Sequence, residues 1–105
     1  MLPKKFNWKE ALTVQDFKAQ TLAQLQKDID RAQCSITINS ENYIEDLSEL
    51  LANLSEEKRA QLLYLVDLPE YSKIMPRSSD DFQTLAEQII HREALKVYWR
   101  SHFSS

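Results

Sequence analysis

The sequence of 105 residues contains no glycine and only three prolines. Glycine adopts the positive φ angles of tight hairpins most easily, and it lines the loops that cradle phosphate groups. Its absence therefore argues against β-sandwiches, Rossmann folds, P-loops and EF-hands together. A helical chain is still easy to build, because Asn, Ser and Asp can form its turns.

Cysteine is also scarce, with Cys34 as the single example. One cysteine excludes an internal disulfide and a thiolate cluster for zinc, so we expect a reducing compartment. The N-terminal stretch MLPKKFNWKEAL lacks the apolar run of a signal peptide, and no window approaches the roughly 20 apolar residues of a membrane-spanning helix. We expect a cytoplasmic protein that does not contact a membrane, with a bacterial source as the default assumption.

Charge is distributed unevenly along the chain. Residues 1–31 carry a net charge of +2, residues 32–70 of −6 and residues 71–105 of +1, for a total of −3. The middle segment has only Lys58 and Arg59 as basic residues. Acidic and basic helices could neutralise one another within one fold, or the middle segment could present an acidic face to a basic partner.

The apolar pattern predicts an all-α fold, a small four-helix bundle-like single domain over residues 1–105 with a short extended connection near 35–39. No repeat, low-complexity run or linker marks a domain boundary. The predicted helices lie near 13–32, 41–53, 56–67 and 80–101. Ile36 and Ile38 alternate with polar residues in the connection, and we expect both to reach the core.

Capping residues indicate where these helices begin. The predicted caps are Thr13 (with Asp16, as in a capping box), Asn39 or Ser40, Ser55, and Ser78 or Ser79. Pro69 is expected to open one short turn that Pro76 ends. The apolar run LLYLV predicts that the third helix is central and well buried. The predicted core is Phe17, Leu22, Leu25, Ile29, Ile44, Leu47, Leu51, Leu63, Val66, Phe82, Leu85 and Ile89.

The last predicted helix changes its pattern halfway along. At 100° per residue, Leu85 and Ile89 lie within roughly 80° of Phe82. Beyond His91–Glu93, the apolar residues up to Tyr98 centre roughly 140° away from that stripe. Three structures would satisfy this change. The helix could bend near His91–Glu93, its second half could project past the bundle with Arg and Lys on the rim, or that half could pack on a different neighbour, a second copy included.

Patterns that could carry chemistry each lack a required element. Glu87 and His91 share a helix face, but a di-iron site needs Glu-x-x-His supplied twice. Asp28 and Asp30 resemble the start of a calcium loop without its glycine. Cys34 lacks the histidine and oxyanion elements of a nucleophile. We therefore predict no catalytic residue, no metal site and no cofactor.

The remaining prediction is a small helical protein–protein interaction module, such as an adaptor, a regulatory subunit or an inhibitor or immunity-type protein. Two stripes repeat every four residues, one basic and aromatic within residues 92–103 and one acidic. The predicted partner-binding residues are Arg92, Lys96, Tyr98, Trp99 and Arg100 on the first stripe and Glu41, Glu45 and Glu49 on the second. A homodimer would set the stripes against each other twice across a two-fold axis, or the stripes could meet within one chain.

Other functions stay open. An acidic immunity or antitoxin protein would cover a basic toxin. An anion- or nucleic-acid-binding protein would use Arg92, Lys96 and Arg100, although three phosphate contacts support only weak, salt-sensitive binding. Nucleic acid is also disfavoured because the chain is acidic overall. An enzyme that uses Glu87 and His91 is the least favoured alternative.

Overall fold

The computed structural model describes residues 6–73 and 76–103, so the first five residues of the MLPKKFNWKEAL stretch lie outside it. The chain is all-α, as predicted, with no strand in this described part. The elements are α1 (Trp8–Ala11), α2 (Gln15–Arg31), α3 (Tyr43–Asn53), α4 (Glu56–Val66), the 3-10 helix η1 (Pro69–Lys73) and α5 (Ser79–Phe103). Among these residues, no helix combines the length and apolar composition needed to cross a membrane.

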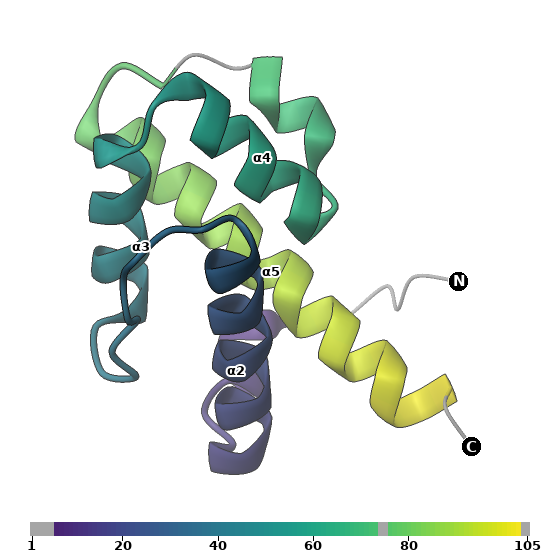
Figure 1. Ribbon diagram of the computed structural model, residues 1–105. Helices are drawn as coiled ribbons and strands as arrows, with labels where there is room; N and C mark the ends of the chain where they lie inside the picture. The colour runs from purple at the N-terminus through teal and green to yellow at the C-terminus, as the bar shows by residue number, and fades with distance from the viewer. Residues whose placement is uncertain (1–5, 74–75, 104–105) are drawn as a thin grey trace.

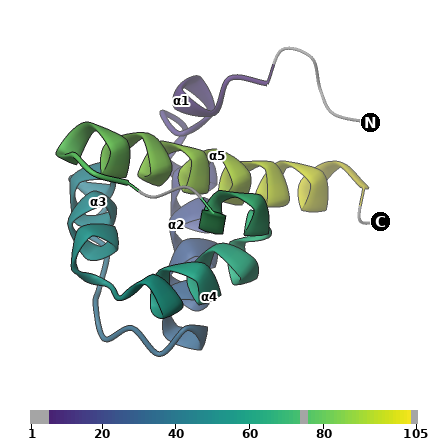
Figure 2. The ribbon, with the colours of Figure 1, turned by 90° about the horizontal axis from the view of Figure 1, so that it is seen from above.

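The long helix α5 is the centre of the fold. It packs against α1, α2, α3 and α4, whereas α4 also packs on η1 and α2. Figure 1 shows α3 beside the first half of α5 and α2 crossing near its middle. In Figure 2, α1 lies on the opposite side of α5 from α4. The prediction of a central third helix was therefore wrong, and Tyr64 of α4 is 72% exposed.

The packing of helix α5 explains why its apolar pattern shifts halfway along. The helix runs without interruption from Ser79 to Phe103, so the first of the three alternatives, a break near His91–Glu93, does not occur. The first half buries residues such as Ile89 in the main core. The second half buries Val97 and its neighbours, and hydrogen-bonds to α2. The apolar stripe turns because the two halves pack on different helices of the same chain.

Two of the predicted helix caps, those of α2 and α3, are wrong. Thr13 does not cap α2; its hydroxyl donates to the carbonyl of Glu10 at 2.6 Å, because the short helix α1 ends just before it. Asn7 caps α1 by accepting from two backbone N–H groups. The cap position of α3 is Asn42, without a side-chain bond, rather than Asn39 or Ser40.

The other two caps are confirmed. Ser55 accepts from the N–H of Lys58 at 3.2 Å, and Ser78 accepts from the N–H of Asp81 at 3.2 Å. The short turn predicted to open at Pro69 is η1. With no glycine in the chain, non-glycine residues take the left-handed turns that end helices. Asp67, with a φ of 77°, ends α4 in this way.

The extended connection between α2 and α3 is held by one side chain. The amide of Gln26 on α2 donates to the carbonyl of Ile36 at 2.8 Å and accepts from the N–H of Ile38 at 3.0 Å. Gln26 therefore pairs with the backbone as a neighbouring strand would, although no strand forms. Ile38 is buried and Ile36 packs against the core, as predicted.

Most of the predicted core is confirmed. Nine of its twelve residues are buried, and Phe17, Ile44 and Phe82 are half-buried against them. The prediction missed several buried side chains. These include Leu12, Ala32, Cys34, Ile38, Leu50, Leu62, Ala86, Ile90, Ala94, Leu95 and Val97. Leu12 and Cys34 lie outside the predicted helical stripes, in the turn before α2 and in the extended connection.

Candidate functional site: a buried charged cluster

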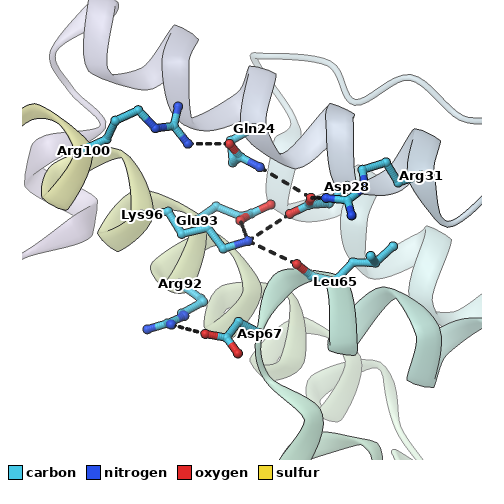
Figure 3. A network of polar contacts seen from close by, with 9 residues as sticks. All are labelled: Gln24, Asp28, Arg31, Leu65, Asp67, Arg92, Glu93, Lys96 and Arg100. Carbon is cyan, nitrogen blue, oxygen red and sulfur yellow. Dashed lines mark hydrogen bonds and ion pairs between the residues drawn. The ribbon is translucent and has the colours of Figure 1, made fainter. Parts of the chain in front are cut away.

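Three helices bring charged side chains together in the interior (Figure 3). Asp28 projects from α2, and Glu93 and Lys96 project from α5. The ammonium Nζ of Lys96 lies 3.1 Å from Oδ2 of Asp28 and 3.0 Å from Oε1 of Glu93. It also donates to the backbone carbonyl of Leu65 on α4 at 3.2 Å. Lys96 thereby joins α2, α4 and α5 at one point.

The cluster contains two carboxyl groups for one ammonium. Asp28 and Glu93 are fully buried, and the side chain of Lys96 is 21% exposed. An ionised carboxylate inside a protein is costly unless charges and hydrogen bonds compensate it. Lys96 can compensate one negative charge, and the exposed Arg31 reaches Asp28 only at 3.9 Å, so a second buried negative charge would be poorly compensated.

Glu93 is the group whose neutral form its surroundings favour. Its pKa is raised to about 9, first by burial and then by its hydrogen bond with Asp28 and the negative charge of Asp28, although Lys96 acts in the opposite direction. Neither oxygen of Glu93 accepts a hydrogen bond from the described residues. Lys96 forms an ion pair with Oε1 at 3.0 Å, which favours the charged form of Glu93 and opposes the effect of burial. A protonated Glu93 that donates to Asp28 accounts for this pattern.

Further polar groups surround Asp28. The amide of Gln24, one turn earlier on α2, donates to Oδ1 of Asp28 at 3.4 Å. Arg31 reaches the same oxygen with Nη1 at 3.9 Å. The guanidinium of Arg100 donates to Oε1 of Gln24 at 2.7 Å. Gln24 therefore links the end of α5 to the buried carboxylate.

Arg92 makes a separate connection to α4. It forms an ion pair with Asp67, the left-handed residue that ends α4, and its guanidinium lies 5.3 Å from the ring centroid of Trp99. The pair is partly exposed, so we expect a small effect on stability. Its position nevertheless joins the end of α4 to the middle of α5.

The three basic residues of the predicted stripe thus bind groups of their own chain. Arg92 contacts Asp67, Lys96 contacts the buried cluster, and Arg100 contacts Gln24. The basic and acidic stripes do not meet in an ion pair within the described residues. Partner binding by the basic stripe stays a prediction, although any partner would compete with these contacts.

Tyr98 and Trp99 of the same stretch are half-buried. Tyr98 packs its ring against Phe6, with centroids 5.0 Å apart, and Phe6 also stacks on His91 at 6.2 Å. Burial, followed by the charge of Arg92, lowers the pKa of His91. Glu87, the proposed partner of His91, is in range of a weak bond from Gln83 at 3.5 Å. The ring contacts of Phe6 with Tyr98 and His91 hold the N-terminal segment on α5.

The predicted acidic stripe lies open on α3. Glu41, just before the helix, and Glu45 and Glu49 on it are all exposed. Within the described part of the chain, no cation forms an ion pair with them. In the same range, His, Cys, Asp and Glu form no group of three or more that could hold a metal ion.

Sequence reasoning missed the two buried carboxyl groups, although each left a signal. Asp28 follows Leu25 by three residues and precedes Ile29, so it lies at the edge of the apolar face of α2. Glu93 follows Ile89 by four residues and therefore lies on the buried face of α5. An acidic residue on the apolar face of a helix indicates that its carboxyl group is buried, but it does not indicate that the two groups meet.

Comparison with known proteins does not indicate a function for this site. The chain matches no protein-family model, no curated protein and no solved structure at a significant level.

Proposed function

We propose that this protein is a small helical interaction module that binds a basic protein surface through the exposed acidic side of α3. The observation that carries the proposal is that Glu41, Glu45 and Glu49 are exposed, while no described cation pairs with them. Glu45 and Glu49 lie one turn apart, about 6 Å along α3, and Glu41 adds a third carboxylate just before the helix. A basic surface of matching spacing would complement these three carboxylates.

The two basic residues of the middle segment support this proposal, because neither one neutralises its acids. Lys58 donates to the carbonyl of Ala32 at 3.1 Å, at the end of α2. Arg59 donates to the carbonyls of Leu51 and Leu54, at the end of α3, at 3.3 and 3.2 Å. Both cations bind the negative ends of helices, where such charges are favourable. The acidic charge of α3 is therefore left for a partner.

A heterologous partner is favoured over a homodimer. A second copy would offer its own basic stripe only if Arg92, Lys96 and Arg100 left Asp67, Asp28 and Gln24. Removing Lys96 would leave buried carboxyl groups without their counterion, which is costly. The same contacts disfavour nucleic-acid binding by this stripe. An inhibitor or immunity-type protein that covers a basic partner fits the proposal, which includes no catalytic step.

Binding of a fluorescently labelled Lys- and Arg-rich helical peptide tests the proposal. The triple variant E41Q/E45Q/E49Q removes these three charges and keeps side-chain shape. At about 0.5 kcal/mol for each exposed ion pair, we expect binding to weaken roughly tenfold. The matched control E10Q/E70Q/D80N removes three charges at exposed positions on α1, η1 and α5, and should bind like the wild type.

Three outcomes would contradict the proposal. The wild type could fail to bind the peptide at low salt, or both triple variants could lose binding equally, which would show a general charge effect. Salt-sensitive binding of a random oligonucleotide that is lost in R100Q would favour nucleic acid instead. Sedimentation over a dilution series tests the homodimer, which predicts a concentration-dependent dimer that weakens in Trp99→Ala.

A further inference from the structure

The buried cluster controls how the second half of α5 is held. The first half of α5 is anchored in the main core by apolar residues such as Ile89 and Ile90. The second half is tied to α2 and α4 through Lys96, which contacts Asp28 and the Leu65 carbonyl. Figure 3 shows these polar contacts at the junction of the three helices. A change of charge in the cluster therefore acts on this half of the helix.

Few charged groups reach Glu93. From α2 it faces Asp28, and from its own helix it faces Lys96. Arg31 of α2 reaches only the far oxygen of Asp28, Oδ1, at 3.9 Å. The group that α4 contributes is the uncharged carbonyl of Leu65, while Asp67 at the end of α4 pairs with Arg92. Lys96 is therefore the cation near both buried carboxyl groups, whereas the exposed Arg31 approaches Asp28 from a greater distance.

We propose that Glu93 and Asp28 hold one proton between them and that this proton locks the second half of α5 onto α2 and α4, so that its loss opens that half of the helix. The geometry supports the lock because two buried carboxyl groups lie 3.1 and 3.0 Å from the same ammonium group. Two carboxyl groups in one site cannot both ionise without repulsion. Opening admits water to both groups and removes that repulsion.

The direction of the pH effect follows from the two states. In the closed state, Glu93 keeps its proton up to a pKa of about 9, whereas an open, hydrated Glu93 loses it near the ordinary pKa of 4.5. Between these values, opening releases one proton and becomes about tenfold more favourable for each pH unit. Above a pH of about 9, Glu93 is ionised in both the closed and the open state, and the opening equilibrium no longer changes with pH. The lock is therefore tightest under mildly acidic conditions.

Infrared spectroscopy tests whether the shared proton exists. At neutral pH in D₂O, the wild type should show the C=O stretch of a buried protonated carboxylic acid, and that band should disappear as pH rises through about 9. Glu93→Gln should lack the band. Asp28→Asn should also weaken it, because Glu93 then faces Lys96 without a neighbouring carboxylate and ionises more easily. The control Glu87→Gln, on the same helix but outside the cluster, should retain it.

Amide hydrogen exchange tests whether the proton holds the helix. After correction for the intrinsic rate, protection of the amides of residues 93–101 should fall about 100-fold between pH 6 and 8 in the wild type. It should stay constant in Glu93→Gln, while the first half of α5 should change less in both proteins. A band that is absent from the folded wild type, or persists unchanged in Glu93→Gln, would overturn the shared proton. Equal pH dependence in both proteins would overturn the lock.

Discussion

Replacing Glu93 by glutamine should change how the stability of the whole protein depends on pH. The neutral amide keeps the size of the protonated acid and can still donate a hydrogen bond to Asp28, but it cannot ionise. In the wild type, the folded state holds a proton on Glu93 that the unfolded chain releases near the ordinary pKa of 4.5. The folded-state pKa is raised, so this stabilisation is complete below about 4.5 and is lost as pH rises to about 9.

The size of the effect follows from one proton. Where only the folded state binds it, the free energy of unfolding falls by about 1.4 kcal/mol for each pH unit. From pH 6 to 8, Glu93→Gln should therefore gain about 2.7 kcal/mol relative to the wild type. Such a difference is a large fraction of the stability of a small domain, which is about 5–15 kcal/mol. Other groups, including His91, titrate in both proteins and cancel in the comparison.

Urea denaturation followed by circular dichroism, repeated for both proteins at several pH values between 5 and 9, measures this difference. The two free energies of unfolding should be close at pH 5 and should diverge steadily above it. A difference that stays constant with pH would show that Glu93 is ionised in the folded protein. It would refute the argument that burial and Asp28 keep this group neutral.

Further predictions concern packing, capping and reactivity. Leu47→Ala, at a fully buried position of α3, should cost about 2–5 kcal/mol of unfolding free energy by urea denaturation, and a cost below about 0.5 kcal/mol would contradict its burial. Tyr64→Ala, at a residue 72% exposed, should change stability by less than about 0.5 kcal/mol in the same assay. Arg59→Met should cost about 1–3 kcal/mol, because the carbonyls of Leu51 and Leu54 lose a charged donor, whereas Arg77→Met at an exposed position should be nearly neutral. Burial raises the pKa of the Cys34 thiol, so Ellman's reagent should react with it only after denaturation, and a rapid reaction of the folded protein would show an accessible thiol.

The carboxylates on α3 and those in the interior have different roles because their surroundings differ. Glu45 and Glu49 are exposed on α3, where we propose that they attract a basic partner. Glu93 is fully buried beside Asp28, so it holds a proton and acts on helix packing. Substitution on α3 should therefore change binding with little effect on stability, and substitution in the cluster should change stability first.

Local sequence patterns determined the helices and most of the core. The absence of glycine, the amphipathic spacing of Leu47 and Leu51, and the caps at Ser55 and Ser78 predicted helices within about two residues of the observed bounds. These features depend on interactions over one or two helical turns, which the order of residues reveals directly. Exposure of the acidic stripe followed from the same periodicity, since it lies opposite the apolar face of α3.

Tertiary structure alone decided which helix is central and where the basic residues of α5 point. Lys96 and Asp28 are 68 positions apart in the chain, and no local pattern indicates that they meet. The sequence determined that the apolar stripe of α5 shifts around the helix. The crossing of α2 determined that helices of the same chain, rather than a second copy, cover the shifted stripe. Protonation of Glu93 likewise depends on burial and on the approach of a distant carboxyl group. Both arise only when α2, α4 and α5 are packed together, because solvent exclusion is a property of the assembled interior.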